Sequence, residues 1–123
     1  MMDWLLQTSL PCPPNPGFSS PLRLVIIFCR VKEKLKIRPG AGGFAFKTDR
    51  NLRQSPSHHH EELEVNLVLS GKATYLFGHH RVPLLASSMI WLFPRQEHVL
   101  IDRSHDFSMW VVVFKPDLVR RFA

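Results

Sequence analysis

The stretch SPSHHHEELEVNLVLSG, residues 55–71, carries the pattern that decides the fold. His58, His60 and Glu64 share one parity, so on an extended strand all three side chains project from the same face. The opposite parity is apolar, with leucine or valine at positions 63, 65, 67 and 69. The stretch therefore predicts a β-strand with one polar and one apolar face.

Two interpretations of that strand are open. In a plain sandwich the apolar parity forms the core, and the histidines and Glu64 face water, as on any half-exposed strand. In a barrel the polar parity turns inward, where His98, which follows the turn at Pro94, is a fourth candidate for the same site. Two or three imidazoles and a carboxylate suit a divalent transition metal such as Fe, Mn, Ni, Cu or Zn.

Strands and turns also account for the later part of the sequence. Ten prolines and nine phenylalanines among 123 residues favour short strands over a helical bundle, because proline interrupts helices and aromatic side chains suit pleated sheets. Pro116 and Asp117 open a short helix expected over 116–122. The chain is therefore predicted to be all-β, a sandwich or barrel with a short C-terminal helix. Apolar runs separated by turns predict its strands at 62–77, 81–85, 89–93, 98–101 and 107–114.

Residues 1–35 differ from the rest. They hold an irregular leader rich in Pro and Ser, and then a basic segment in which apolar residues alternate with cations as in a half-buried strand. We expect one domain over residues 36–123, with the leader outside the fold. Residues 30–53 supply the whole formal net charge of +6. We interpret them as a solvated basic surface, with a phosphate-contacting arm as the alternative.

The sequence indicates neither secretion nor membrane contact. The N-terminus lacks the basic region of a signal peptide, and the apolar run 24–29 is far shorter than the roughly 20 residues of a spanning helix. Cys12 and Cys29 have no CxxC spacing, so they are expected to be reduced structural thiols. A cytoplasmic protein is therefore expected.

Other chemically notable residues have ordinary interpretations. His79, His80 and His105 fall in expected turns, where exposed polar side chains are usual. Trp91 and Trp110 lie in apolar strands and are expected to belong to the core. No GxSxG element and no phosphate-binding glycine loop is present, so neither a serine hydrolase nor a nucleotide site is indicated.

The His-rich stretch resembles the first motif of the cupins: His, any residue, His, three or four residues, Glu, six residues and Gly, here at His58, His60, Glu64 and Gly71. Further on, SSMIWLFPRQEH is similar to the second motif as it occurs in the N-terminal domains of AraC-type transcription regulators, with His98 four residues beyond Pro94. The resemblance covers residues 36–123. It implies a small cupin-like, jelly-roll β-barrel that binds a small-molecule effector and forms a homodimer.

The resemblance also implies a site. In cupin enzymes the two histidines and the glutamate of the first motif and the histidine of the second motif bind the metal; carried over, these are His58, His60, Glu64 and His98. Many members of the regulator family use the barrel interior for an organic effector without a metal. The chain departs from the second motif by carrying Ser87 or Ser88, and Gln96, in place of glycines, and Asp102 in place of Asn. Turn glycines can be replaced where the backbone keeps φ negative, so these departures bear more on enzymatic chemistry than on the fold.

Two functions follow from the resemblance. The first is the effector-sensing and dimerisation domain of an AraC-type regulator, which is not an enzyme. Such regulators reach DNA through a pair of helix-turn-helix units, and no such region follows Ala123 in this sequence, so this chain is not expected to read DNA by itself. The alternative is a stand-alone metal-dependent cupin enzyme of the isomerase or dioxygenase type. A metal-free barrel that only dimerises is a third option.

Overall fold

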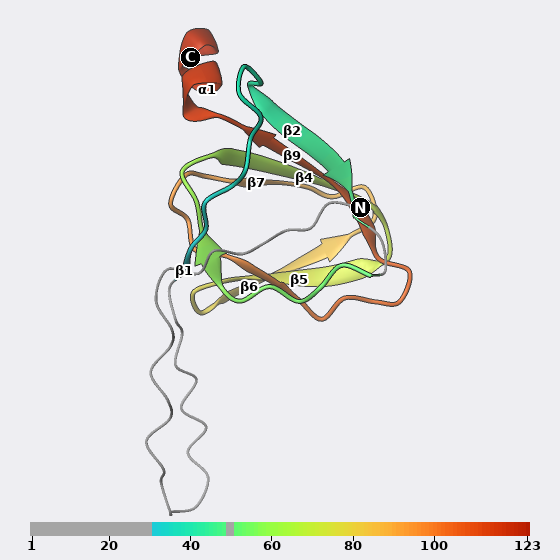
Figure 1. The fold of residues 1–123 in the computed structure, drawn as a ribbon. Helices are drawn as coiled ribbons and strands as arrows, with labels where there is room; N and C mark the ends of the chain where they lie inside the picture. The colour runs from blue at the N-terminus through green and yellow to red at the C-terminus, as the bar shows by residue number, and fades with distance from the viewer. Residues whose placement is uncertain (1–30, 49–50) are drawn as a thin grey trace, which may run out of the picture.

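The structure is a computed structural model of the chain and describes residues 31–48 and 51–123. The all-β prediction with a short C-terminal helix is confirmed, and the helix spans the residues expected (Figure 1). The elements of the described residues are β1 (Val31–Lys32), β2 (Gly43–Lys47), β3 (His58–His59), β4 (Leu63–Ser70), β5 (Lys72–Phe77), β6 (His80–Leu85), β7 (Met89–Leu92), β8 (Val99–Ile101), β9 (Ser108–Phe114) and α1 (Pro116–Phe122).

Two antiparallel sheets face each other. One has the strand order β2-β9-β4-β7 and the other the order β6-β5-β8. Figure 1 shows them as an upper and a lower layer, with β1 at the left end, where it pairs in parallel with β3. We call the region between the layers the barrel interior. Its hydrophobic core contains Val68, Ala73, Tyr75, Leu84, Leu92, Phe107, Met109, Val111 and Val113.

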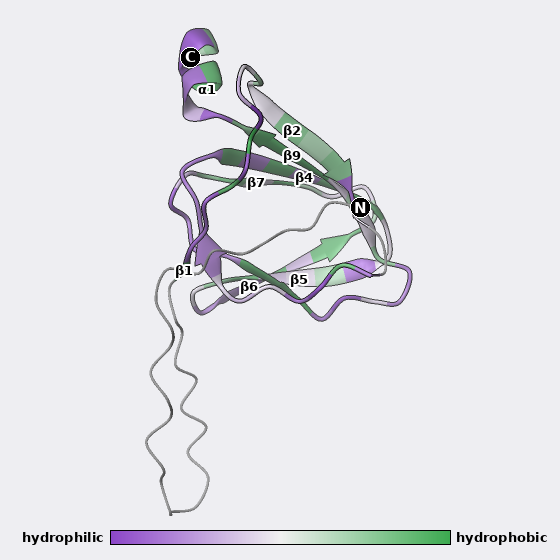
Figure 2. Ribbon diagram, in the orientation of Figure 1, coloured by the Kyte–Doolittle hydropathy of each residue, from purple (hydrophilic) through white to green (hydrophobic). Residues whose placement is uncertain are grey.

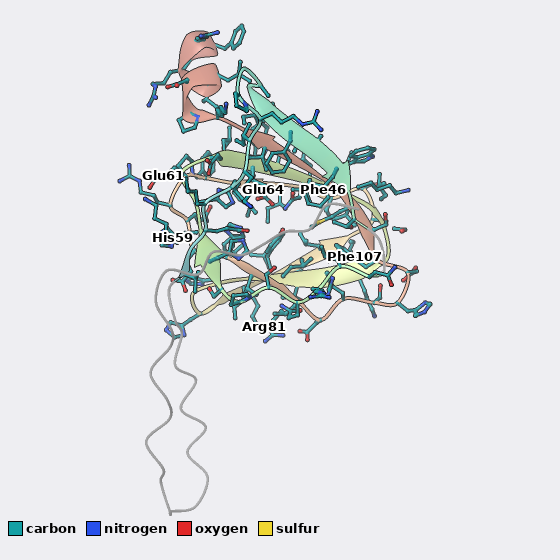
Figure 3. The ribbon with its side chains drawn as sticks, viewed as in Figure 1. Phe46, His59, Glu61, Glu64, Arg81 and Phe107 are labelled. Carbon is teal, nitrogen blue, oxygen red and sulfur yellow. The ribbon has the colours of Figure 1, made fainter. Side chains whose placement is uncertain are left out.

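The orientation of β4 decides between the two interpretations of the His-rich stretch. Glu64 and Asn66 are buried, whereas Leu67 and Leu69, on the other parity, are each 40% exposed. The plain sandwich, with the apolar parity as core, is therefore wrong. The physical reason lies in the neighbouring strands, because cross-strand partners share a face and the partners of Glu64 are inward-facing apolar residues of β7 and β9. Figure 3 shows Glu64 and Phe107 between the two layers and Arg81 outside the lower one.

The strand material expected over 62–77 is a hairpin, β4 followed by β5. Gly71 makes the turn at φ +72°, a left-handed conformation that favours glycine. A Cβ at this position would also lie 2.7 Å from the backbone nitrogen of Phe107. The motif glycine is therefore needed both for its backbone angle and for the close approach of the chain beside it.

The two tryptophans are not in the core, contrary to the expectation from the sequence. Trp91 is 47% exposed and Trp110 is 41% exposed. Their strands do contribute to the core, but through the alternate positions, such as Leu92 and Val111, which face inward. Figure 2 shows the hydrophobic residues that run along β2, β9 and β4. Apolar residues therefore lie on both faces of this sheet.

The three histidines that the sequence assigns to turns behave as expected. His79, His80 and His105 are exposed, at the turn into β6 and in the turn before β9. They lie outside the interior that the two sheets enclose, and we assign them no part in the site.

The described part of the basic segment keeps the predicted alternation. Residues 31, 33, 35 and 37 are half-buried, and the cations at 32, 34, 36 and 38 are exposed, although only Val31–Lys32 form a strand. Leu35 packs against the core, N-terminal to the domain boundary expected at residue 36. The expected leader and both cysteines lie outside the described residues.

Backbone strain occurs at the turns of the second motif. Among the described residues, the non-glycine positions with left-handed backbone are Ser87 (φ 69°), Arg95 (φ 64°) and Asp102 (φ 52°). The condition that substituted turns keep φ negative therefore fails at Ser87. The turn between β6 and β7 still uses the conformation that glycine adopts most easily, and serine adopts it at a cost.

Among residues 31–48 and 51–123, no helix is both long enough and apolar enough to cross a membrane.

Candidate metal centre

The candidate site lies at the end of the interior closed by β1 and β3. His58 opens β3, and its backbone exchanges two hydrogen bonds with His98. The His58 N–H donates to the His98 carbonyl over 3.1 Å, and the His58 carbonyl accepts from the His98 N–H over 2.9 Å. The backbone carbonyl of His60 accepts from the Arg95 N–H over 2.7 Å. The second motif is thus tied by its backbone to the first, which brings His98 beside the two earlier histidines.

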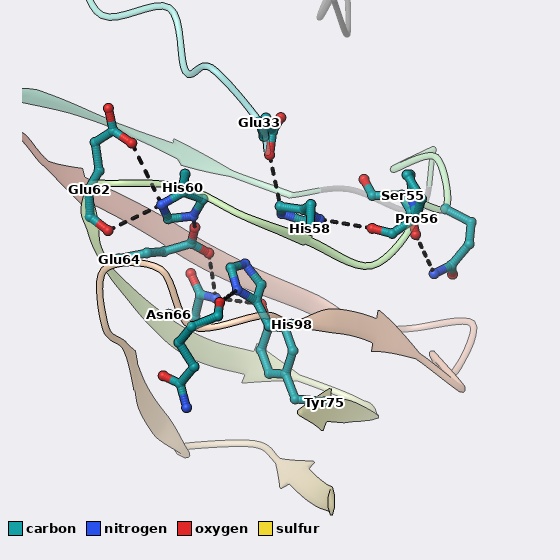
Figure 4. Close-up of polar contacts among 12 residues, drawn as sticks. Glu33, Ser55, Pro56, His58, His60, Glu62, Glu64, Asn66, Tyr75 and His98 are labelled. Carbon is teal, nitrogen blue, oxygen red and sulfur yellow. Dashed lines mark hydrogen bonds and ion pairs between the residues drawn. The ribbon is translucent and has the colours of Figure 1, made fainter. Parts of the chain in front are cut away.

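The three histidines form a compact cluster (Figure 4). Each of His58, His60 and His98 offers one ring nitrogen, and these nitrogens all lie within 4.8 Å of one another. Two nitrogens bound to one metal at about 2.1 Å can be separated by no more than about 4.2 Å. A small inward movement of the rings therefore suffices for all three to hold one ion.

The hydrogen bonds of the rings determine which nitrogen is available. A carbonyl oxygen only accepts, so each Nδ1 that contacts one carries a hydrogen and donates it. In a neutral ring the Nε2 atom then holds the lone pair, which is how a ligating histidine is commonly oriented by its surroundings. When His60 is protonated, its Nε2 also carries a hydrogen, and this hydrogen faces Glu64 Oε2. The contacts are His58 Nδ1 to Pro56 O at 2.9 Å, His60 Nδ1 to Glu62 O at 3.1 Å, and His98 Nδ1 to Gln96 O at 2.8 Å.

Glu64 joins the site from β4. Its Oε2 lies 3.0 Å from His60 Nε2, and its Oε1 accepts a hydrogen bond of 2.8 Å from Asn66 Nδ2. Two adjacent ligands of one metal at about 2.1 Å are also about 3 Å apart, so the pair has the spacing of neighbouring ligands. The structure thus gathers His58, His60 and His98 into one cluster and sets Glu64 against one of them.

Burial and mutual charge set the protonation states. Burial lowers the pKa of His98 to about 4, so this ring is neutral at pH 7. Burial also opposes the charge on His60, but the hydrogen bond and the charge of Glu64 outweigh it and raise the His60 pKa. For Glu64 burial acts upward, yet the hydrogen bonds from His60 and Asn66 hold its pKa below the usual value. A metal would therefore replace the proton that His60 and Glu64 share.

The chain's own donors fit a transition metal. Three imidazoles with oriented Nε2 atoms and one ionised carboxylate are nitrogen and oxygen donors that first-row divalent ions accept. The site is buried, so bound metal would be shielded from bulk water.

Sequence reasoning missed three residues of this region. Asn66 and Tyr75 are buried beside Glu64, and Glu33 Oε2 lies 3.2 Å from His58 Nε2. The parity of Asn66, which is that of Glu64, was the available signal. For Glu33 the signal was an acid on the half-buried parity of the basic segment. Tyr75 had none, because its strand becomes a neighbour of Asn66 only through the hairpin.

One protein family matches most of the chain. Residues 42–123 match the family model described as the AraC-like ligand binding domain. No curated protein matches the chain.

The chain is also similar to solved structures. A cupin-2 conserved barrel domain protein from Salinispora arenicola CNS-205 is 24% identical, with 72% of this chain and 77% of that chain covered and a TM-score of 0.51. A cupin-2 domain containing protein from Shewanella frigidimarina NCIMB 400 is 18% identical, with 58% of this chain and 67% of that chain covered and a TM-score of 0.48. An HTH_3 family transcriptional regulator from Vibrio cholerae is 22% identical, with 61% of this chain and 44% of that chain covered and a TM-score of 0.49.

The first of these similarities supports the two-sheet architecture, and the family model accounts for the sequence from Gly42 to the last residue. The chain therefore belongs to the family of AraC-like ligand-binding domains, which are barrels of the cupin type.

Proposed function

We propose that residues 36–123 are the effector-sensing and dimerisation domain of an AraC-type transcription regulator, and that a small organic molecule binds in the barrel interior. The observation that carries this proposal is the inward polar parity of β4, which buries Glu64 and Asn66 among apolar neighbours. Buried polar groups in an apolar interior are a common design for ligand sites. The family match supports the same function. The regulator would act in the cytoplasm and reach DNA through a DNA-binding region rather than through this barrel.

We further propose that His58, His60, Glu64 and His98 hold one divalent transition metal. The support is the 4.8 Å cluster of the three histidines and the 3.0 Å spacing of Glu64 from His60. A metal held there would offer its remaining coordination positions to an oxygen or nitrogen of the effector. The chain's own contribution is to fix the three rings through their carbonyl contacts and to exclude water by burial.

The test of sensing uses two matched variants. Ala73→Leu adds three carbons at a buried, inward position of β5, and Ala45→Leu adds the same carbons at an exposed position of β2. Wild type and Ala45→Leu are expected to retain a small molecule in equilibrium dialysis against a bacterial metabolite extract, read by mass spectrometry, and Ala73→Leu to lose it. Retention by neither wild type nor Ala45→Leu contradicts sensing. Circular dichroism confirms that each variant is folded.

The same experiment separates sensing from the enzyme alternative. A sensor releases its effector unchanged, so the retained molecule is recovered with its original mass. A stand-alone metal-dependent cupin enzyme would use the same four ligands but convert the molecule over time. Time-dependent appearance of a product with wild type, and not with His98→Gln, would favour the enzyme.

Dimerisation is proposed through the outer face of the β2-β9-β4-β7 sheet. Its large exposed side chains are contiguous, because Leu67 pairs with both Met89 and Trp110, and Val65 pairs with Trp91. Met89 is 61% exposed and the tryptophans are nearly half exposed. This patch exposes on the order of 500 Å² of apolar surface, against about 800 Å² buried per partner in a standard interface.

A second copy of the chain is the occupant that this outer face fits. Among the described residues of the four strands, the charged side chain on this face is Lys47, opposite Trp110 at the edge strand. A charged partner would find no matching charge there. A second copy would bury apolar surface against apolar surface and leave Lys47 at the rim, as in stable homodimers.

A further inference from the structure

One hydrogen-bonding group in the barrel interior has no partner. Asn66 is 0% exposed, and its Nδ2 donates to Glu64 Oε1 over 2.8 Å and to the Tyr75 hydroxyl over 2.5 Å. Its Oδ1 is buried and accepts no hydrogen bond from any residue that the structure describes. Native structures seldom leave a buried acceptor unpaired, so such an atom points to a donor from outside the chain.

The orientation of the Asn66 amide follows from its neighbour. Exchanging its oxygen and nitrogen would set Oδ1 against the carboxylate of Glu64, and neither group would then supply a hydrogen. The other carboxylate oxygen, Oε2, lies 3.0 Å from His60 Nε2, which leaves Oε1 to accept a hydrogen bond from Asn66. The NH2 group must therefore face Glu64, and Oδ1 is the free atom.

Tyr75 supplies the complementary free group. Its oxygen accepts from Asn66 Nδ2, and within residues 31–48 and 51–123 its hydroxyl hydrogen has no acceptor. A phenol hydroxyl both accepts and donates, so its hydrogen is available to a ligand. A free donor and a free acceptor therefore lie side by side in the interior.

Apolar side chains flank Asn66 within its own sheet. Asn66 pairs across the sheet with Ile90 of β7 and Val111 of β9, which share its inward face. Val111 is buried, and Ile90 packs against the core. A molecule that reaches the pair would therefore meet hydrocarbon from β7 and β9, beside the polar side chains of Glu64 and His98.

We infer that Asn66 and Tyr75 are the specificity-determining pair of the barrel interior, and that they select an effector with a hydroxyl or primary amide on a small apolar body. Such a group donates to Asn66 Oδ1 and accepts from the Tyr75 hydroxyl. A molecule without it would leave both groups unpaired, which is the strongest way for a buried site to reject an analogue. The inference rests on the proposed function, because it requires that a small molecule enter the interior.

The test compares matched probes that differ in one donor. Cyclohexanol is paired with cyclohexanone, isobutyramide with 3-methyl-2-butanone, and benzamide with acetophenone. Each ketone only accepts hydrogen bonds, whereas its partner donates and accepts. Binding to the whole chain is measured by saturation-transfer NMR and titration. The alcohol and amides are expected to bind wild type about tenfold more tightly than their ketones, the discrimination that one hydrogen bond of ordinary strength provides.

Three variants locate the preference. Tyr75→Phe removes only the hydroxyl, and Asn66→Leu removes the free acceptor; both are expected to abolish the tenfold preference. Thr74→Val removes the hydroxyl of the residue directly before Tyr75 in β5, on the other face of its sheet. This variant is expected to keep the tenfold preference. Circular dichroism checks folding, and Tyr75→Phe decides the matter alone if Asn66→Leu does not fold.

The outcomes separate this inference from the proposed function. Binding without preference, or a preference that survives Tyr75→Phe, overturns the inference and leaves sensing intact. A crystal structure of a probe complex in which a water still bridges Asn66 and Tyr75 overturns it as well, since the pair then holds a buried water only. Failure of all six probes to bind wild type overturns the inference, and sensing is then judged by the metabolite dialysis.

Discussion

His58 and His98 exchange two backbone hydrogen bonds, of 3.1 and 2.9 Å, although one begins the first motif and the other ends the second. This bridge sets their rings 4.5 Å apart, centroid to centroid. Because the backbone rather than the side chains makes the link, either imidazole can be replaced without losing it. The site can therefore be examined by substitution in a folded chain.

Loss of one histidine is expected to remove metal binding. His98→Gln takes away one of three clustered nitrogens, and we expect the affinity for Ni²⁺ or Zn²⁺ to fall by roughly a hundredfold or more, beyond what loss of an orienting residue costs. Competition with a chromophoric chelator measures it. His105→Gln, at an exposed position, is the control and is expected to bind as wild type does. Equal affinities for all three proteins would exclude the proposed centre.

Metal-free protein is expected to lose stability on mild acidification because of His98. Its pKa falls from 6.5 to about 4 on folding, so between pH 7 and pH 5 the unfolded chain takes up a proton that the folded chain refuses. The free energy of unfolding then drops by about 2 kcal/mol from this group. His60 acts in the opposite direction, because its raised pKa adds stability that is complete below 6.5 and is lost as pH rises through the raised value. Glu64, whose pKa is lowered, stays ionised across this range.

Urea denaturation of wild type and His98→Gln at pH 7 and pH 5 isolates the contribution of His98. The variant keeps His60 and Glu64, so its change in unfolding free energy should be less unfavourable than that of wild type by about 2 kcal/mol. Parallel changes in the two proteins would show that the burial of His98 does not govern the effect.

Ser87→Gly is expected to stabilise the chain. Ser87 holds φ 69° in an exposed turn, and removing its Cβ relieves about 1 kcal/mol of backbone strain. Ser88→Gly is the matched control, because the Ser88 hydroxyl accepts from the Leu85 N–H over 3.2 Å and the residue has no left-handed angle. Thermal unfolding should give a higher midpoint for the first variant and a lower one for the second. A lower midpoint for Ser87→Gly would contradict the strain.

Charge on the outer face is expected to dissociate the dimer. Trp91→Lys places a cation among Leu67, Met89 and Val65, where a second copy would have to desolvate it. Phe122→Lys makes the same exchange on α1, away from the sheet, at a side chain that is 84% exposed. Sedimentation velocity should find wild type and Phe122→Lys as dimers and Trp91→Lys as a monomer. A monomeric wild type would refute the interface.

Much of the site followed from periodicity. The shared parity of His58, His60 and Glu64 places them on one face, and Asn66 belongs to the same face. The tryptophans were misplaced for a related reason. Period-two alternation identifies two faces of a strand but not which face is inside, and both faces of β7 and β9 are apolar.

The amino-acid sequence by itself determined the strand parities, the short C-terminal helix and the glycine turn at Gly71, because each depends on local backbone geometry. Tertiary structure alone decided that the polar face of β4 points inward, that His98 joins His58, and that Tyr75 lies against Asn66. Those relationships depend on contacts between strands distant in sequence. Their stability comes from burying the inward apolar side chains of both sheets together, and no local sequence pattern specifies which face of a strand is buried.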